Sequence, residues 1–270
     1  MKKISRRSFM AAAAVSVAAL AMTACGGSAS SAASSEAAST SAAAGALTTV
    51  EAGKLTMATN AAFPPYEMTT DAGEFEGIDI ETAQAIADKL GLELQIDDMD
   101  FDAALLSVQQ GKADIVMAGV TVTDERKAVM DFSDNYATGI QSIIVPEGSD
   151  IASPDDLAGK KIGTQRGTTG YIYCSDDFGD DAVVAYDNGL TAVQALNNGQ
   201  VDAVVIDNAP AKEYVAANPG LAILDTSYAE EDYAIGLAKG SALEDAVNAA
   251  LEELKADGTL QSIVDKYITA

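Results

Sequence analysis

The sequence predicts an α/β protein made of two successive parallel-sheet units. Short apolar runs that suit buried strands alternate with segments of helical periodicity after residue 50. A pattern of helix, glycine, Xaa-Asp and strand occurs twice, at residues 105–116 and 192–205. Common βα punctuation can produce such a pattern by convergence, but two similar lobes facing each other across a cleft explain it more economically. Apolar residues make up 48% of the 270 residues, which is enough for two cores.

The first unit is expected to contain three strands and two helices. They follow one another as strand 54–59, helix 80–90, strand 92–96, helix 101–108 and strand 115–117. Each helix is predicted from apolar residues three and four positions apart, with a glycine after its last turn. Strands that alternate with helices in this way are typical of a parallel sheet.

The second unit repeats the alternation, starting from a long apolar strand. Its predicted elements are strand 139–145, a turn and strand at 157–164, a helix that begins at 167–170, strand 183–186, helix 190–196, strand 201–206, helix 209–216 and strand 221–224. One more strand at 233–238 and two helices at 243–255 and 259–267 complete the chain. A loop over residues 146–149 separates the first strand of this unit from the rest.

Residues 1–24 have the features of a bacterial lipoprotein signal peptide. A basic segment, which includes Arg6 and Arg7, precedes an apolar run over residues 11–21 that is too short to span a bilayer, which needs about 20 residues. Residues 5–10 also resemble a twin-arginine export motif, although a plain basic segment explains them equally well. The export route therefore stays open.

Cys25 is the predicted lipidation site. The residues that end in Cys25 resemble a lipobox, with Met22 where leucine is usual. A buried apolar cysteine is the alternative, but Cys25 lies between an apolar run and a polar tether. Residues 25–48 are rich in serine and alanine and cannot form a core, so we expect a flexible linker.

The charge balance excludes several classes of function. The chain has 16 Lys and Arg against 41 Asp and Glu, and without residues 1–24 the balance becomes 12 against 41. So acidic a protein is poorly suited to nucleic acid or to anionic lipid headgroups, and we expect a monomer. The absence of histidine removes the commonest general base and the commonest transition-metal ligand. The sequence thus predicts no catalytic centre, no metal and no cofactor.

The stretch from Gly119 to Arg126 has the composition of an anion-binding turn. An apolar run ends at Gly119, and Thr121, Thr123 and Arg126 follow it. Backbone N–H groups, hydroxyls and a guanidinium gathered at one point suit a carboxylate. Taken alone, however, Arg126 in the charged run 124–127 is more simply a solvated surface residue.

An ordered set of motifs resembles one family of binding proteins. The motifs are residues 63–67, 77–80, 111–114, 121–126, 131–133, 167–169 and 257–259. Together they resemble the polar amino-acid substrate-binding proteins of ABC importers, the family that includes glutamine-, histidine- and lysine/arginine/ornithine-binding proteins. The likeness covers residues 50–270.

The resemblance implies a type II periplasmic-binding-protein fold, in which two Rossmann-like lobes are joined by a two-strand hinge. It places residues 49–138 and 234–270 in the first lobe and residues 139–233 in the second. The crossings are expected near residues 136–140 and 228–233.

The resemblance also implies a clamp for the two charges of an amino acid. Arg126 would hold the α-carboxylate, assisted by Thr121 and by backbone N–H groups near Gly119. From the other lobe, Asp207 would hold the α-ammonium, and its alternative role as a helix N-cap does not exclude this. Hydroxyl or N–H contacts of the second lobe would come from Thr168 and Thr169.

The remaining predicted contacts concern the side chain of the ligand. Phe63 and Phe101 would sandwich it. Asn60 stands where several relatives have an acid, which weakens the case for lysine or arginine and favours a neutral polar ligand such as glutamine. Arg166, next to the second-lobe threonines, keeps an acidic amino acid possible.

The predicted function is that of an extracytoplasmic lipoprotein, anchored by lipid to the bacterial cell membrane, that delivers a polar amino acid to an ABC permease. An alternative on the same fold is a periplasmic dehydratase of the cyclohexadienyl type, which acts on prephenate- or arogenate-like substrates. That reaction needs a general acid, for which Glu67 is available. The sequence leaves the identity of the amino acid open.

Overall fold

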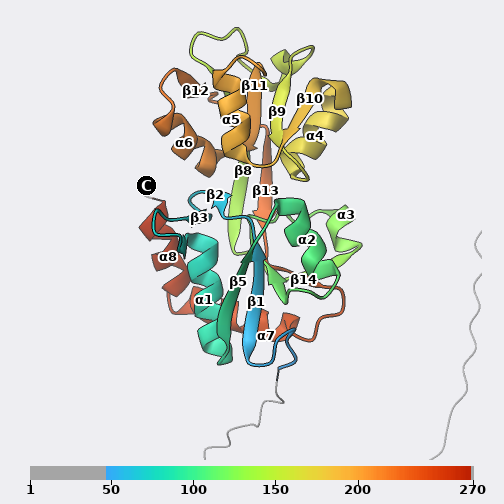
Figure 1. Ribbon diagram of the computed structural model, residues 1–270, viewed down its shortest axis with the longest axis vertical. Coiled ribbons are helices and arrows are strands. Elements are labelled where there is room, and N and C mark those ends of the chain that lie inside the picture. Colours follow the sequence, from blue (N-terminus) through green and yellow to red (C-terminus); the bar gives the residue numbers. More distant parts are fainter. Residues whose placement is uncertain (1–46, 269–270) are drawn as a thin grey trace, which may run out of the picture. The chain divides into compact units, whose positions relative to one another are not determined.

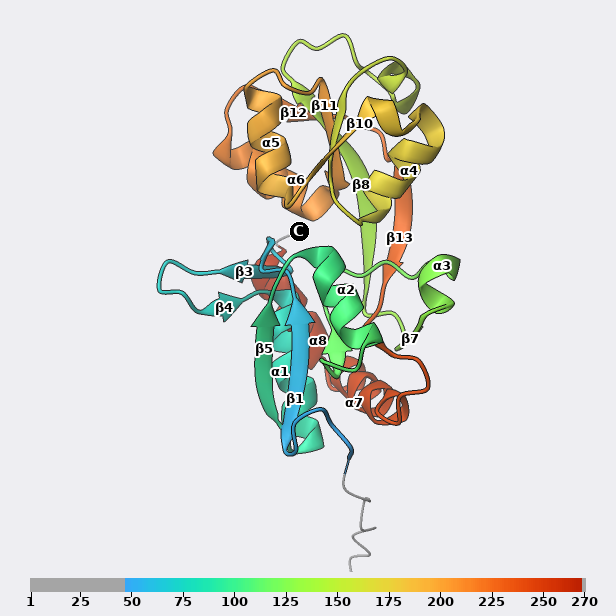
Figure 2. The same cartoon turned by 45° about the vertical axis from the view of Figure 1, so that its right-hand side comes forward.

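The structure is a computed structural model that describes residues 47–268. The predictions for the signal peptide, for lipidation of Cys25 and for most of the linker lie outside the described residues. Figures 1 and 2 show two α/β lobes, one built on each of two sheets, with strands β8 (Ala137–Pro146) and β13 (Ala229–Tyr233) running between them.

The first sheet belongs to the lobe that we call lobe 1. Its strand order is β5 (Glu93–Asp98), β1 (Lys54–Thr59), β6 (Ile115–Val116), β14 (Gly236–Ala238) and β7 (Met130–Phe132). Helices α1 (Ile78–Leu90), α7 (Glu244–Ala256) and α8 (Thr259–Tyr267) pack together on one face, and α2 (Phe101–Gln109) covers the other. Alternate residues of β1 serve the two cores, since Leu55 and Met57 face α1 while Ala58 faces α2.

Two smaller features of lobe 1 reach toward the second lobe. Strands β2 (Ala62–Phe63), β3 (Glu67–Thr69) and β4 (Phe75–Glu76) form a separate antiparallel sheet. The short helix α3 (Asp124–Lys127) follows β6. Both carry residues of the predicted site.

The second sheet belongs to the lobe that we call lobe 2. Its order is β10 (Val183–Tyr186), β9 (Ile162–Gln165), β11 (Ala203–Asp207), β8 and β12 (Leu221–Ile223), and β13 also pairs with β8. Its helices are α4 (Thr169–Phe178), α5 (Gly189–Asn197) and α6 (Asn208–Ala217), with short 3-10 turns at Pro154–Leu157 and Asp180–Ala182. Cys174 of α4 is a free thiol buried in one of the two cores.

Each sheet is mixed, so it contains antiparallel strands in addition to the parallel units that the sequence predicted. The predicted strand–helix units do pair in parallel, as β1 does with β5 and β6, and β9 with β10 and β11. The antiparallel strands are β14 in the first sheet and β8 in the second. Each of them enters its sheet directly after the chain crosses between lobes, without an intervening helix to reverse its direction.

The predicted strand at 233–238 is two strands in the structure. β13 ends at Tyr233 in contact with β8, and β14 starts at Gly236 in contact with β6. Ala234 and Ile235 lie where the chain leaves one sheet for the other. Continuous apolar character hid this break, because a change of sheet needs no turn residue.

β8 and β13 form an antiparallel ribbon that joins the lobes. Their register runs from Ala137 opposite Tyr233 to Gln141 opposite Ala229. At the lobe 1 end, the backbone of Tyr233 also bridges to Thr121. The predicted lobe boundaries, after residues 138 and 233, fall inside β8 and at the end of β13.

The duplicated sequence pattern has the same structural role in both lobes. Asp114 Oδ2 accepts a hydrogen bond of 2.8 Å from Thr56 N, at the start of β1. Asp202 Oδ2 accepts one of 2.8 Å from Lys161 N, just before β9. Each aspartate thus ties the beginning of its own strand to the neighbouring parallel strand of its sheet, which aligns the carboxyl ends of the strands at the edge that faces the other lobe.

Candidate functional site

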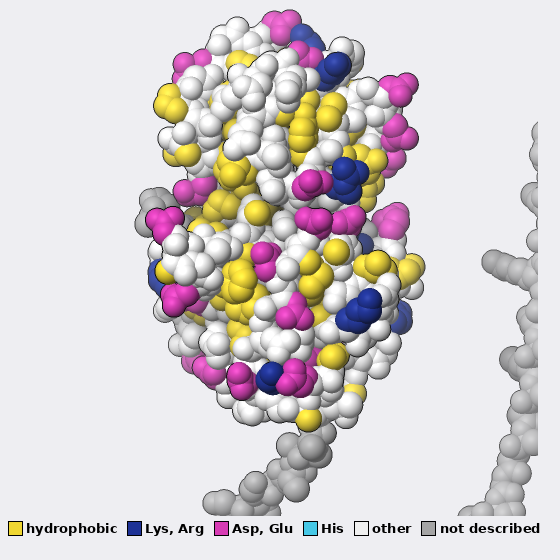
Figure 3. Space-filling view, in the orientation of Figure 1, with side chains coloured by type: hydrophobic (Ala, Val, Ile, Leu, Met, Phe, Trp, Pro, Cys, Tyr) yellow, Lys and Arg dark blue, Asp and Glu magenta, His cyan; other side chains and the backbone are white. Residues whose placement is uncertain are grey.

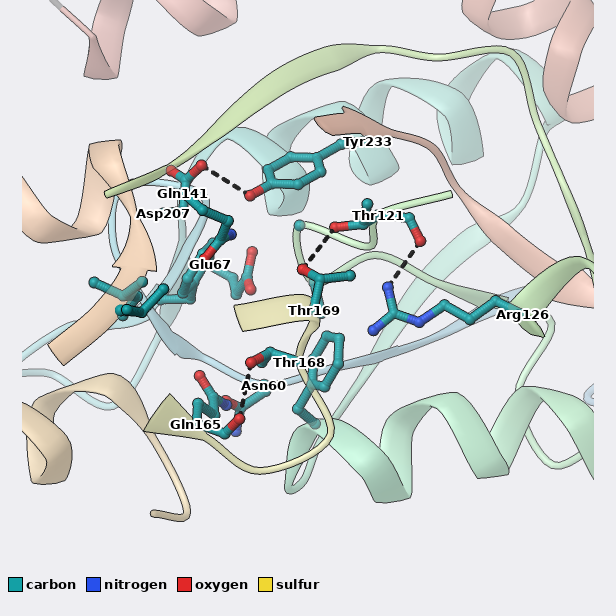
Figure 4. A pocket seen from close by; sticks show the side chains of 16 residues that line it. Asn60, Glu67, Thr121, Arg126, Gln141, Gln165, Thr168, Thr169, Asp207 and Tyr233 are labelled. Atoms are coloured by element: carbon teal, nitrogen blue, oxygen red, sulfur yellow. Dashed lines mark hydrogen bonds between the residues drawn. The ribbon is translucent and has the colours of Figure 1, made fainter. Parts of the chain in front are cut away.

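A cavity lies between the two lobes at the edge where the strands end. It is lined by residues of both lobes and of the ribbon, and small-molecule sites occur preferentially at such interfaces between domains. Figure 4 shows the side chains that line it. They are Asn60, Phe63, Glu67, Phe101, Ala118, Gly119, Thr121 and Arg126 on one side, Gln141, Gln165, Thr168, Thr169, Val205, Ile206 and Asp207 on the other, and Tyr233 at the ribbon.

Hydrogen bonds join the lobes around this cavity. Gln165 Nε2 donates to Asn60 Oδ1 at 2.9 Å, and the hydroxyl of Tyr214 donates to Ala62 O at 2.7 Å. Arg126 Nη2 donates to the carbonyl oxygen of Gly167 at 3.2 Å. The structure therefore has the lobes closed over the site.

Arg126 is a buried cation without an acidic partner in the described residues. Thr123 caps α3 and accepts a hydrogen bond from Arg126 N at 3.2 Å, which orients the first turn. The guanidinium donates to Thr121 O at 2.7 Å and lies 5.4 Å from the centre of the Phe101 ring. Only 8% of the residue is exposed, and burial lowers the pKa of Arg126. A cation desolvated in this way favours an anionic ligand.

The start of helix α4 adds backbone donors beside Arg126. Thr168 is the N-cap, and its hydroxyl accepts from Tyr171 N at 3.3 Å. The backbone N–H groups of Thr169 and Gly170 donate to no group among the described residues. Free N–H groups at a helix N-terminus attract a carboxylate, so Thr169 and Arg126 can bind the same anion from opposite lobes.

Asp207 lies at the other side of the cavity, as Figure 4 shows. It caps α6, since Oδ1 accepts from Ala209 N at 2.9 Å, and Oδ2 accepts from Ile140 N at 2.8 Å and from the Tyr233 hydroxyl at 2.9 Å. Burial raises the pKa of Asp207, and these three hydrogen bonds oppose the shift. A carboxylate has about four acceptor positions, which leaves room for one more donor. The N-cap role and a place in the cavity wall thus coexist in one residue.

Thr121 and Gly119 line the cavity, but the backbone N–H of Gly119 and the hydroxyl of Thr121 already donate to other groups. Gly119 N donates to Asp79 Oδ2 at 3.0 Å, and the Thr121 hydroxyl donates to Glu231 Oε2 at 3.0 Å. Neither of these two hydrogens is then available to a ligand carboxylate, whereas the backbone N–H of Thr121 donates to no group among the described residues and can still serve the role expected from the sequence. Thr121 Oγ1 can still accept a hydrogen bond, which suits an ammonium. Gly119 has φ +55°, and a Cβ there would lie 2.9 Å from the Phe63 ring, so the close approach requires glycine.

The two aromatic residues expected to hold the ligand side chain lie on different elements of lobe 1. Phe63 ends β2, and its ring stacks on Tyr66 at 5.7 Å between centroids. Phe101 starts α2 and has the guanidinium of Arg126 over its ring. Between them, Asn60 Nδ2 donates to Met99 O at 2.8 Å, which orients its amide.

Glu67 is a lining residue that the sequence reasoning considered only for catalysis. It is fully buried, and no N–H or hydroxyl group in the described part of the chain donates to its carboxyl oxygens, which interact instead with the carboxyl of Asp79. Burial raises the pKa of Glu67 well above its usual 4.5, and the charge of Asp79 raises it further. The β2–β3 hairpin pairs Glu67 with Phe63, so the two face the cavity together. The signal in the sequence was the hairpin itself. A turn at Pro64 and Pro65 brings position 67 back beside position 63.

Arg166 does not line the cavity, unlike the other nine predicted residues. Its guanidinium is half exposed, 3.9 Å from Asp187 Oδ1. Adjacent strand residues point to opposite sides, and Gln165 occupies the inward position. Gln141 and Tyr233 are further lining residues absent from the prediction, because both come from the ribbon that only the tertiary structure assembles.

Two further findings concern residues 47–268 as described. None of their helices combines the length and the apolar character needed to cross a membrane. Among the same residues, no group of three or more Asp, Glu or Cys side chains is arranged to hold a metal ion.

Two α/β lobes, a ribbon of two strands and a closed polar cavity between them define the class of type II periplasmic-binding proteins. Residues 55–270 match the family model described as bacterial extracellular solute-binding proteins, family 3. The chain therefore belongs to family 3 of the bacterial extracellular solute-binding proteins.

Several relatives have comparable length. A probable histidine-binding protein of Neisseria gonorrhoeae is 34% identical over 95% of this chain and 94% of its own length. The arginine-, lysine-, histidine-binding protein ArtJ of Geobacillus stearothermophilus is 34% identical, with a TM-score of 0.77, over 80% of this chain and 96% of ArtJ. An ancestral arginine-binding protein, solved with glutamine bound, is 43% identical, with a TM-score of 0.77, over 81% and 99% of the two chains.

These relatives are binding proteins without enzymatic activity. The chain is likewise a binding protein and not an enzyme, so the dehydratase alternative is set aside. The buried Glu67 must then be explained by binding rather than by acid catalysis.

Proposed function

We propose that the chain binds a free polar amino acid between its lobes and delivers it to an ABC importer. One observation carries this proposal: a buried guanidinium and a buried carboxylate, Arg126 and Asp207, face one cavity from opposite lobes. A zwitterion that leaves water needs a partner for each charge, because an unpaired buried charge costs several kcal/mol. The α-amino acids carry this pair of charges at a fixed spacing.

The α-carboxylate is assigned to Arg126 and the first turn of α4. The guanidinium can approach it with two parallel hydrogen bonds, and the N–H of Thr169 adds a third from lobe 2. Closing the lobes brings these donors together, so the ligand favours the closed form through contacts that an open form lacks.

The α-ammonium is assigned to Asp207 and Thr121. Asp207 provides the charge, and Thr121 Oγ1 provides an oxygen whose own hydrogen is engaged elsewhere. In Figure 4 Thr121 and Thr169 lie between Arg126 and Asp207, where the α-carbon of a ligand would be expected.

The carboxylate assignment can be tested with Arg126→Ala and Arg126→Lys. Arg126→Ala is expected to weaken amino-acid binding at least about 100-fold, and Arg126→Lys at least about tenfold, because lysine keeps the charge but loses the planar fork. Calorimetric titration measures both dissociation constants. Arg166→Ala is the matched control, since it removes a guanidinium outside the cavity and should change the affinity less than about twofold. Unchanged affinity in Arg126→Ala would refute the assignment.

A glutamine-like side chain fits the part of the cavity wall formed by Asn60, Gln165 and Glu67. Asn60 and Gln165 offer amide groups there, and a protonated Glu67 can donate to an amide oxygen. The related ancestral protein was solved with glutamine bound. An acidic ligand is less well supported than it was from the sequence, because Arg166 points away.

Arginine is a second candidate, and Glu67 is the observation that favours it. A buried carboxyl that no donor group contacts can release its proton to solvent when a guanidinium binds, and the carboxylate then accepts two hydrogen bonds from that guanidinium. The same ancestral protein was also solved with arginine bound. A thermal-shift screen of the amino acids tests both candidates, because tight binding raises the apparent stability. Glu67→Gln should weaken arginine at least about tenfold and leave glutamine within about threefold.

The cellular setting is part of the same proposal. The protein is exported, held at the outer face of the bacterial cell membrane by lipid on Cys25, and works as a monomer that docks on ABC permease subunits. The acidic side chains spread over the face in Figure 3 suit a protein that stays in solution around its anchor. Labelling with a radioactive fatty acid should mark the wild type and not Cys25→Ser, and equal labelling of both would exclude this anchor.

A further inference from the structure

Glu231 is a buried acid beside the proposed ammonium site, yet it does not line the cavity. It lies on β13, and 5% of its surface is exposed. Oε2 accepts hydrogen bonds from Thr121 Oγ1 and from Gln141 Nε2, both at 3.0 Å. Oε1 is buried and accepts no hydrogen bond within 3.5 Å among residues 47–268, although the Tyr173 hydroxyl interacts with this carboxyl and the pKa of Tyr173 is raised to about 12, chiefly by burial and further by Glu231. Buried acids are normally ion-paired or fully hydrogen-bonded, so the position of Glu231 needs an explanation.

The charge of Glu231 acts on both ends of the proposed clamp. Burial raises the pKa of Asp207, and the charge of Glu231 adds to that increase. Burial lowers the pKa of Arg126, and the charge of Glu231 opposes that decrease. Asp207 and Arg126 in the cavity wall and Glu231 behind the wall therefore bring two carboxylates and one guanidinium to this region, which favours a cation near Asp207.

The hydrogen bond to Glu231 also determines how Thr121 meets a ligand. A hydroxyl has one hydrogen and two lone pairs. With the hydrogen directed at Glu231, the contact of 3.4 Å between the Thr121 and Thr169 hydroxyls has Thr169 as donor. Toward the cavity Thr121 then presents a lone pair only.

We propose that Glu231 is a positioning residue that holds the hydroxyl hydrogen of Thr121, so that Thr121 faces the cavity as an acceptor for the α-ammonium of the ligand. This inference rests on the proposed function, since it requires a ligand with an ammonium group beside Asp207. Glu231 touches no ligand itself. Its effect passes through one hydroxyl, whose other possible orientation would direct a hydrogen at the ammonium.

Two substitutions separate the acceptor role of Glu231 from its charge. Glu231→Gln keeps an oxygen where Oε2 lies, and that oxygen alone accepts both hydrogen bonds. Glu231→Met fills the same volume without an acceptor and frees the Thr121 hydroxyl. Thr121→Val removes the hydroxyl and keeps the shape of the side chain.

The test compares ligands with and without an α-ammonium. Dissociation constants are measured by competition for glutamine and 4-carbamoylbutanoic acid, and for arginine and 5-guanidinopentanoic acid. Glu231→Met should weaken the amino acids about tenfold, the effect of one hydrogen bond, and their des-amino analogues less than about twofold. Glu231→Gln should restore the affinity to within about threefold of the wild type. The double variant of Glu231→Met with Thr121→Val should bind no more weakly than Thr121→Val alone, because both changes act on one contact.

Other outcomes would overturn the inference. Equal weakening of an amino acid and its des-amino analogue in Glu231→Met would mean that Glu231 only maintains the fold. If circular dichroism shows that Glu231→Met does not fold, the affinities for the amino acids and their des-amino analogues are compared in Thr121→Val instead. An equal loss of affinity for both kinds of ligand in that variant contradicts the inference. If the wild type binds no amino acid at all, the proposed function fails, whereas amino-acid binding that is indifferent to all these variants refutes the role of Glu231 alone.

Discussion

The two ends of the cavity differ in how completely their polar groups are paired. At the end assigned to the backbone of an amino acid, Arg126 and Asp207 already make hydrogen bonds to backbone and side-chain groups that hold them in place. At the end assigned to the ligand side chain, no N–H or hydroxyl group in the described chain donates to the carboxyl oxygens of Glu67, which interact with the carboxyl of Asp79. The first end is preorganised for one pair of charges, and the second can change its protonation with the ligand. We therefore expect Arg126 and Asp207 to select amino acids as a class, and Glu67 to select among their side chains.

Asp207 is the residue at which a substitution should weaken binding the most. Asp207→Asn keeps the shape and the N-cap oxygen but removes the charge, so every amino acid should bind at least about 100-fold more weakly, whatever its side chain. Calorimetry with glutamine and arginine measures both losses, which should be similar. A loss confined to one ligand would show that Asp207 belongs to the side-chain end.

The affinities for arginine and for glutamine should depend differently on pH. If Glu67 is neutral in the free protein and ionised against a guanidinium, arginine binding releases one proton. The affinity for arginine should then rise up to about tenfold per pH unit from pH 6 until the pH reaches the raised pKa of Glu67, while the affinity for glutamine stays level. The pKa of Asp79, raised to about 6 by burial, lies at the lower edge of this window, and the tyrosines nearby have raised pKa values and stay neutral throughout.

Titrations of arginine in two buffers of different ionisation enthalpy count the released proton directly. The Glu67→Gln variant is the control and should release none. An arginine affinity that does not change with pH in the wild type would mean that Glu67 keeps its proton in the complex.

The smallest expected effect concerns stability without ligand. The pKa of Glu67 is raised by burial, so the folded protein retains a proton that the unfolded chain loses above its usual pKa of 4.5. Stability therefore falls as pH rises from that value toward the folded-state pKa, by up to about 1.4 kcal/mol per pH unit from this group. Glu67→Gln lacks this loss and should become progressively more stable than the wild type between pH 5 and 7. Urea unfolding at several pH values measures the difference, and parallel curves for the two proteins would contradict it.

Much of the fold was predictable because it depends on local periodicity. The spacing of apolar residues predicted α1, α2, α7 and α8 to within a few residues, and β1 and β10 with the bounds that the structure shows. Strand direction was not predictable in the same way. β8 and β14 are antiparallel to their neighbours because of where the chain crosses between lobes, and no feature of their own residues marks it.

The residues of the site also differ in whether local sequence patterns could predict them. Arg126 and Thr121 were found because one continuous stretch, a strand followed by a capped turn, brings them together. Glu67 and Tyr233 were not, since a hairpin and a crossing ribbon place them beside residues distant in the pattern. For Arg166 the strand alternation alone indicated an outward side chain, once Gln165 is taken as the inward one.

The sequence by itself determined the class of protein: two α/β lobes, an acidic surface without histidine, and an arginine and an aspartate at strand ends of different lobes. These properties follow from composition and from local spacing, which the chain carries wherever it folds. Only the tertiary structure decided which hydrogen bonds are already made. The roles of Glu67, Thr121 and Glu231 depend on donors and acceptors that meet across the ribbon and the lobes, because hydrogen bonds are satisfied in space and not along the chain.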